Sequence, residues 1–155
     1  AFRGNGMGDM KMFEYKGSGL DGIFLKNGFS LVESPYGKGV VIEDMEGLHK
    51  AIAADIIRQK TPMTGHQFRF LRKEQDLVQA ELAALLRVDV QTVARWEKLG
   101  SEAVPGPADF SMRAFYSAFC HILNGPFEVL PGAEPDESAV FAIGEDHRWG
   151  EAIAA

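Results

Sequence analysis

The first third of the chain alternates between apolar and polar residues in a way that predicts short β-strands. Asn27-Gly28 separates the first two of these strands and is a strong signal for a tight hairpin turn. The segment 35–39, PYGKG, predicts a second turn before the last strand. Three segments have the apolar runs or the alternation expected of strands, namely residues 23–25, 29–33 and 40–42.

A helix is predicted after these strands, because apolar residues return at every fourth position. Leu48, Ile52 and Ile56 form the stripe, and Asp44 is placed to cap the first turn. Three strands and one helix make only a marginal core by themselves. We therefore expect this module either to pack on the rest of the chain or to form a surface between subunits.

Two short helices joined by a tight turn are predicted for residues 79–98. Asp89 is expected to cap the second helix through its carboxylate. Gln91, Thr92 and Arg95 then lie on the face of that helix opposite to its apolar residues. By itself this pattern fits an ordinary helical hairpin as well as a helix-turn-helix that reads DNA. The apolar residues of the packed faces and the turn are Leu82, Ala83, Leu86, Val88, Val93 and Trp96.

The C-terminal third begins with a predicted helix, residues 108–124, which has a broad face of aromatic and aliphatic side chains. Two candidate strands follow, at 127–130 and 138–143, and the remainder is acidic and contains Trp149. Three alternatives are open for this extension. It pairs with the N-terminal sheet, exchanges onto a partner subunit, or stays partly disordered.

Together these elements predict an α+β fold in four segments. The opening segment is Gly-rich and unpatterned, and we expect a tail that is disordered or derived from expression, with Met7, Met10 or Met12 as the native start. The segments are 1–11, the tail; 12–60, a small β-rich module with a helix; 61–124, a helix-turn-helix domain; and 125–155, an acidic C-terminal extension that contains the candidate strands.

Charge is unevenly distributed along the chain, although the whole chain carries a net charge of −6. Residues 58–98 hold eight basic and five acidic residues, a net of +3, whereas residues 99–155 carry −7 and residues 1–57 carry −2. An acidic chain is not expected to bind nucleic acid indiscriminately. The local positive excess nevertheless coincides with the predicted helix-turn-helix. Chance clustering of surface lysines and arginines is the alternative.

Candidate catalytic and metal-binding groups are scarce. Cys120 is the only cysteine, its apolar surroundings favour a buried structural thiol, and the four histidines are scattered. The acidic residues Glu43, Asp44 and Glu46 favour the start of a helix over a metal site. We therefore predict no metal, no cofactor, no catalytic residues and no enzyme activity. The chain has no apolar run of about 18 residues and no apolar N-terminal stretch, which favours a cytoplasmic protein without a membrane partner.

The central motif is long and uninterrupted. The run FRFLRKEQDLVQAELAALLRVDVQTVARWEKLG resembles the Xre family of lambda-repressor-like (Cro-type) helix-turn-helix regulators, which includes HigA- and MqsA-type antitoxins. The resemblance covers residues 63–123. Two positions depart from it, since Val78 replaces a polar helix cap and Arg87 replaces a turn glycine. The matching elements are Phe68-x-x-Leu71-Arg72, Leu77-x-Gln79-x-x-Leu82-Ala83, Leu86-x-Val88 and Gln91-Thr92-Val93-x-x-Trp96-Glu97.

The resemblance implies roles for individual positions. Val90, Gln91 and Arg95 occupy the positions that face the bases, where Val90 is suited to a thymine methyl group. Arg72 and Glu97 match an ion pair between two helices of the domain, which we expect to be structural. The positions expected to contact DNA phosphates are Gln79, Thr92 and Lys98.

The resemblance also implies partners. The expected partner is double-stranded DNA, read by a homodimeric repressor that places residues 90–98 in two half-sites of a palindromic operator. If the chain is the antitoxin of a toxin–antitoxin pair, a cognate toxin would bind residues 12–60 or 125–155. The competing hypothesis is a protein- or ligand-interaction module with a vestigial helix-turn-helix, which the net acidity and the residues Val78 and Val90 favour.

Overall fold

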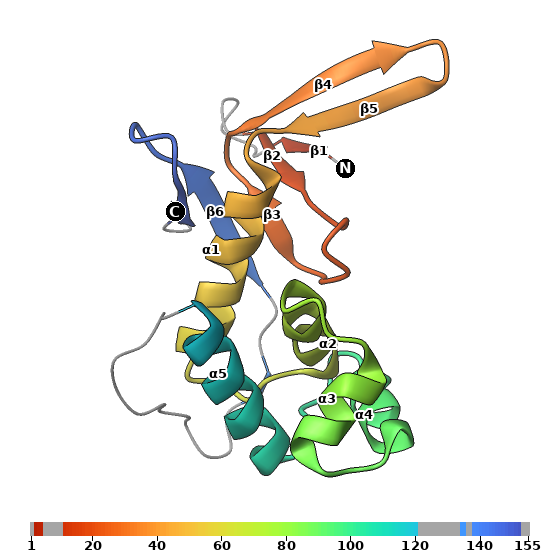
Figure 1. Cartoon of the computed structure of the whole chain (residues 1–155). Helices are drawn as coiled ribbons and strands as arrows, with labels where there is room; N and C mark the ends of the chain where they lie inside the picture. Colours follow the sequence, from red (N-terminus) through yellow and green to blue (C-terminus); the bar gives the residue numbers. More distant parts are fainter. Residues whose placement is uncertain (1, 5–10, 121–133, 136–137, 153–155) are drawn as a thin grey trace. The chain divides into compact units, whose positions relative to one another are not determined.

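The computed structural model describes residues 2–4, 11–120, 134–135 and 138–152, and it has the α+β fold that the sequence predicts (Figure 1). The chain divides into two units, of which the first combines Ala1–Ile52 with Ser138–Ala155 and the second is Ala53–Glu137. The division falls inside helix α1 (Met45–Arg58), which the sequence pattern placed entirely in the N-terminal module.

A five-stranded sheet in the first unit joins the two ends of the chain. Its order is β1-β2-β3-β6-β7, and β3 and β6 are parallel whereas the other neighbours are antiparallel. The C-terminal extension therefore follows the first of its three alternatives, and residues 2–4 of the expected tail form a strand. The strands are β1 (Phe2–Gly4), β2 (Lys11–Glu14), β3 (Ile23–Leu25), β6 (Ala139–Ile143) and β7 (Trp149–Glu151). The candidate strand 127–130 lies outside the described residues.

The hairpin predicted at Asn27-Gly28 is wrong, because the strands on its two sides belong to different sheets. Strand β4 (Phe29–Ser34) pairs instead with β5 (Gly37–Ile42) around the second predicted turn. The Asn27 side chain accepts a hydrogen bond from the Ile143 N–H at 2.6 Å and donates one to the Ile143 carbonyl at 3.2 Å. Asn27 thus joins the edge of β6 rather than closing a hairpin.

The core of the first unit lies between the sheet and the start of α1. Leu25 and Phe141 are a register pair of β3 and β6, and both are fully buried. The predicted stripe of α1 is confirmed, since Leu48 and Ile52 are fully buried and Ile56, in the second unit, is nearly so. The predicted cap is also present, because an Asp44 carboxylate oxygen accepts the Gly47 N–H at 3.1 Å.

Among the described residues, four helices follow α1 in the second unit, which also includes the end of α1 from Ala53 (Figure 1). A capping box starts the first of them, in which the Thr64 hydroxyl accepts the Gln67 N–H and the Gln67 side chain accepts the Thr64 N–H. Phe68 and Trp96 meet edge to face, with 5.7 Å between ring centroids. The helices are α2 (Gly65–Glu74), α3 (Gln79–Leu86), α4 (Val90–Glu97) and α5 (Gly106–Cys120). The predicted end of the last helix, at 121–124, lies outside the described residues.

A buried ion pair on α5 holds the segment that precedes α2. Arg113 and Asp109 form this pair, and Arg113 is 1% exposed. The guanidinium also donates to three backbone carbonyls of residues 57–61, with distances of 2.6 Å to Gln59 O and 2.9 Å to Thr61 O. The second Asp109 oxygen accepts the Met63 N–H at 2.9 Å. This role of Arg113 is not among the predictions made from the sequence.

Cys120 is half-buried and not fully buried as predicted. It lies one helical turn after Tyr116, which is 1% exposed. Burial, followed by the hydrogen bond to the Cys120 side chain, raises the pKa of the Tyr116 hydroxyl above its ordinary value. Tyr116 therefore stays neutral at physiological pH and serves as a core residue. Among the described residues, no helix has the length and apolar character needed to cross a membrane.

Gly65 allows α2 to approach the end of α4 closely, which gives a first prediction. A Cβ atom added there would lie 2.5 Å from the Trp96 carbonyl oxygen and 2.9 Å from the Gly100 nitrogen. Because backbone atoms cannot yield, Gly65→Ala is expected to lower the free energy of unfolding by about 1–3 kcal/mol. Guanidinium unfolding followed by tryptophan fluorescence measures the loss.

Gly106 provides a matched control for this substitution. It also begins a helix, but an added Cβ would meet no atom within 4 Å. Gly106→Ala is therefore expected to leave stability unchanged or slightly higher, because alanine has the better helix propensity. Equal stability of the two variants would contradict the close approach at Gly65.

Candidate nucleic-acid interface

The turn between α3 and α4 is made by a residue in the left-handed region. Arg87 has φ 57° and ψ 45°, and the Val88 N–H returns to the Ala83 carbonyl at 3.0 Å. The left-handed backbone expected where Arg87 replaces a glycine is thus present, with the mild strain of a side chain in that conformation. This turn sets the direction in which α4 leaves α3.

The start of α3 compensates in part for its missing polar cap. Val78 occupies the cap position and its side chain has no acceptor. The Glu81 carboxylate accepts the Val78 N–H at 3.0 Å, which supplies half of a capping box. Only the half that requires a Ser, Thr, Asn or Asp at position 78 is lost.

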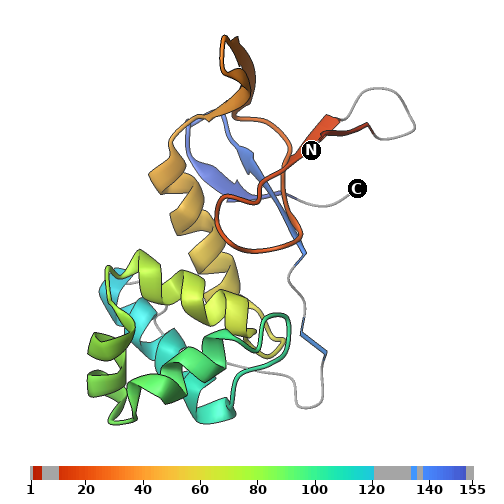
Figure 2. The same cartoon turned by 90° about the vertical axis from the view of Figure 1, so that its right-hand side faces the viewer.

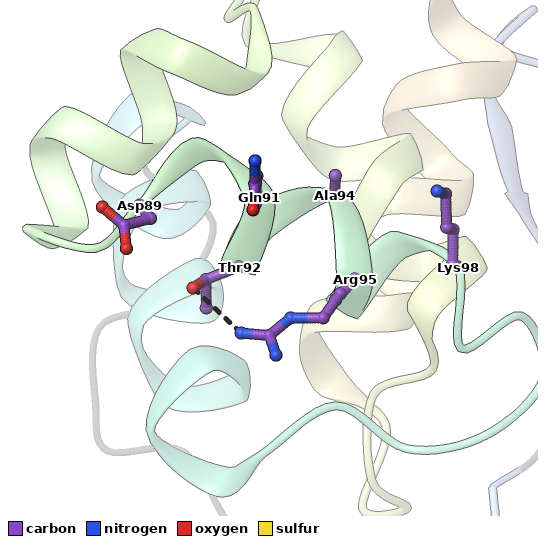
Figure 3. Close-up of a pocket in the computed structure, with 6 residues that line it drawn as sticks. All are labelled: Asp89, Gln91, Thr92, Ala94, Arg95 and Lys98. Atoms are coloured by element: carbon purple, nitrogen blue, oxygen red, sulfur yellow. Dashed lines mark hydrogen bonds between the residues drawn. The ribbon is translucent and has the colours of Figure 1, made fainter.

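Asp89 lies at the cap position of α4, as predicted, but its carboxylate makes no capping hydrogen bond. The prediction is therefore correct for the position of the cap residue and wrong for its side-chain hydrogen bond. Asp89 is exposed, so water can solvate the carboxylate without help from the helix. Its side chain instead borders the outer face of α4 (Figure 3).

The outer face of α4 carries a row of polar side chains around an open hollow of about 340 Å³ (Figure 3). Gln91, Arg95 and Lys98 are exposed, and their spacing of four and three residues places them on one side of the helix. Arg95 is turned toward Thr92 and donates to its hydroxyl at 3.3 Å. The hollow is lined by Asp89, Gln91, Thr92, Ala94, Arg95 and Lys98.

The hollow gathers only some of the residues to which the resemblance gave DNA-contacting roles. Gln91, Thr92, Arg95 and Lys98 line it together. Val90 is 44% exposed at the start of α4 but does not line the hollow. Asp89 and Ala94 also line it, although neither is among the positions predicted to contact DNA. Ala94 lies three residues after Gln91 and four before Lys98, and Asp89 lies three residues before Thr92, so helical spacing was the signal that would have found them.

The side chain of Gln79 bonds within the protein, whereas the resemblance implies that it contacts a DNA phosphate. Its side-chain nitrogen donates to a Glu97 carboxylate oxygen at 2.8 Å. A phosphate contact by Gln79 would therefore use the second hydrogen of its side-chain amide or its backbone N–H at the start of α3. The half-buried Gln79 side chain thus links α3 to α4.

Glu97 forms the centre of a buried polar network. Its other carboxylate oxygen accepts from Arg72 Nε at 2.7 Å, so the ion pair implied by the resemblance is present. The Arg72 guanidinium also donates to the Leu77 carbonyl at 2.7 Å. Both side chains of the pair are more than nine-tenths buried. Since Gln79 completes the network, the Glu97 carboxylate joins α4 to α2 and α3, and Arg72 extends the network to the loop between α2 and α3.

Comparison with models of protein families, with curated proteins and with solved structures found no match to this chain. Within the described ranges, no group of three or more His, Cys, Asp or Glu side chains is arranged to hold a metal ion. Amide, hydroxyl, guanidinium and ammonium groups share one face of α4, and such groups bond to base edges and phosphates.

Proposed function

We propose that the protein is a sequence-specific DNA-binding transcriptional regulator that reads the major groove with α4. One observation carries the proposal, namely the row of exposed polar side chains on a helix whose other face is buried. Val93 and Glu97 anchor the buried face, while Gln91 and Arg95 stand on the exposed one. A major-groove reader needs this combination of a fixed helix and free forked side chains.

The charge distribution supports a specific rather than a general DNA-binding protein. Residues 58–98 carry a net charge of +3 within a chain of net charge −6. So small an excess supports few phosphate contacts per domain, and binding weakens with salt according to that number. We therefore propose a homodimeric repressor, in which two copies of α4 occupy half-sites about 10 base pairs apart.

The proposal includes two further alternatives. The chain would be an antitoxin if a toxin protein binds residues 12–60 or 125–155, and co-purification of a small partner encoded beside it would favour that role. The competing hypothesis is an interaction module with a vestigial helix-turn-helix. The exposed Val78, at 58%, and Val90, at 44%, are the observations that favour it.

The second prediction tests base reading. Selection from random double-stranded DNA first identifies the preferred site, and binding is then measured at several salt concentrations. The double substitution Gln91→Ala/Arg95→Ala is expected to weaken binding to that site by about 1–3 kcal/mol for each bidentate contact removed. Binding to unrelated DNA is expected to change far less, because it depends on phosphate contacts.

Arg69→Ala provides the control, since Arg69 is an exposed arginine of the same unit that does not line the hollow. It removes the same charge as Arg95→Ala and is expected to preserve the preference for the selected site. Unchanged binding by the double variant would exclude α4 as the reading helix. If the wild-type protein enriches no site even at low salt, the interaction-module hypothesis is favoured instead.

A further inference from the structure

Strands β4 and β5 form a two-stranded hairpin that the five-stranded sheet does not include, and we call residues 29–42 the hairpin arm. Among the described strands, β4 and β5 hydrogen-bond only to each other. Their register runs without a bulge from Phe29 opposite Ile42 to Ser34 opposite Gly37. Both views show the arm extending away from the sheet of its own unit (Figure 1, Figure 2).

The hairpin arm exposes several large apolar side chains on its two strands and its tip. Leu31 is 54% exposed, Val32 is 42%, Val41 is 53%, and Tyr36 at the tip is fully exposed. A two-stranded hairpin alone is marginally stable in water. β-Branched and aromatic residues stabilise strands when they pack against neighbours. The composition of the arm therefore suits a strand that is covered on at least one side.

Among the described residues, no strand pairs with the outer edge of β4. Proteins usually protect such edges by short strands, charges, proline or bulges. The outer strands of the large sheet, β1 and β7, are three residues long, whereas β4 is six residues long. Within β4 only Glu33 is charged, and no proline or bulge interrupts it. The first unit thus protects one sheet by short edge strands and leaves the other unprotected.

The net charge of the hairpin arm indicates which partner suits the edge of β4. Glu33 and Lys38 are the only charged residues of the hairpin arm, and they lie directly opposite each other, so the arm is neutral. The chain as a whole carries −6, and two copies repel each other wherever acidic surfaces meet. The arm is a surface on which two copies can meet without that repulsion. A nucleic acid, by contrast, would find a single lysine there.

We infer that β4 pairs in antiparallel fashion with β4 of a second copy of this chain, forming a four-stranded sheet about a two-fold axis. Centring the axis on Leu31 places Leu31 opposite the second copy's Leu31, and Phe29 opposite Glu33, so no like charges face each other. Such an isologous contact closes with two copies. The inference deepens the proposed function, which needs a dimer, and names the segment that supplies it.

The third prediction tests this pairing with the full chain and without DNA. Sedimentation equilibrium over a range of protein concentrations should show a reversible dimer for the wild type. Leu31→Lys, which places two lysines in the joined sheet, is expected to raise the dimer dissociation constant by about 100-fold. Leu85→Lys is the matched control, since Leu85 is 55% exposed on α3, and it should leave the dimer unchanged.

A second variant separates pairing from folding. Leu31→Thr/Val32→Thr keeps strand-forming side chains but removes apolar surface, and it should also weaken the dimer while circular dichroism stays that of the wild type. A monomeric wild type, or a dimer that survives both arm variants, overturns the inference. Loss of the dimer in Leu85→Lys but not in Leu31→Lys does so too. Because no DNA is present, none of these outcomes depends on whether α4 reads bases.

Discussion

Replacing Glu97 by alanine is expected to destabilise the second unit, called the helical unit below, by lowering its free energy of unfolding by about 3–5 kcal/mol. The substitution leaves the Arg72 guanidinium buried with the Leu77 carbonyl as its remaining partner. It also frees the Gln79 amide that links α3 to α4. A buried charge without its partner costs far more than an exposed ion pair contributes. DNA binding should therefore disappear together with the fold.

The measurement has to report on the helical unit alone. Trp96 lies in that unit and Trp149 in the other, so a Trp149→Phe background makes the fluorescence specific for Trp96. Guanidinium unfolding then gives the stability of each variant in that background. Glu102→Ala, at an exposed glutamate, is the control and should change little. If Glu97→Ala is as stable as the control yet binds no DNA, Glu97 acts at the interface and not in the core.

The parts of the fold that follow from local periodicity were predictable. The apolar stripe of α1 and the apolar spacing of α3 and α4 repeat within one or two helical turns, so each helix is visible in its own sequence. The turn at Arg87 was predictable as well, because few conformations connect two helices over so short a distance. Local signals of this kind depend little on the rest of the chain.

The order of strands in the five-stranded sheet was not predictable, because it joins residues far apart in the sequence. The parallel pairing of β3 with β6 places Phe24 beside Val140. Asn27-Gly28 has the sequence of a hairpin turn, yet Asn27 bonds to Ile143, and an added Cβ on Gly28 would lie 2.7 Å from the Trp149 ring. Long-range contacts thus override a local turn preference, as they often do in sheets.

For the candidate site, the helix face on which each side chain lies was predictable, but the hydrogen-bond partners of the side chains were not. Gln91, Arg95 and Lys98 lie on one exposed face because their spacing places them there. The orientation of Gln79 depends on Glu97, which approaches from another helix. Asp89 has the right position for a cap but lacks the bond, since an exposed carboxylate has water as an alternative partner. Spacing cannot determine such choices.

Replacing Arg113 by alanine is expected to destabilise the helical unit by about 3–5 kcal/mol as well, although Arg113 is remote in sequence from the helix-turn-helix. The change leaves the buried Asp109 carboxylate with only the Met63 N–H. It also removes the guanidinium donor to the Ile57, Gln59 and Thr61 carbonyls, which ties the end of α1 and the segment after it to α5. Loss of these hydrogen bonds adds to the cost.

Three variants in the Trp149→Phe background separate the charge of Arg113 from its geometry. Arg113→Lys keeps the charge but has one ammonium in place of a fork, so it should recover only part of the lost stability. Arg58→Ala removes an exposed arginine at the end of α1 and should change little. Arg113→Met/Asp109→Leu removes both buried charges and should be more stable than Arg113→Ala, because the carboxylate no longer lacks its partner. If the double variant is instead the less stable of the two, the carboxylate's bond to the Met63 N–H matters more than the ion pair.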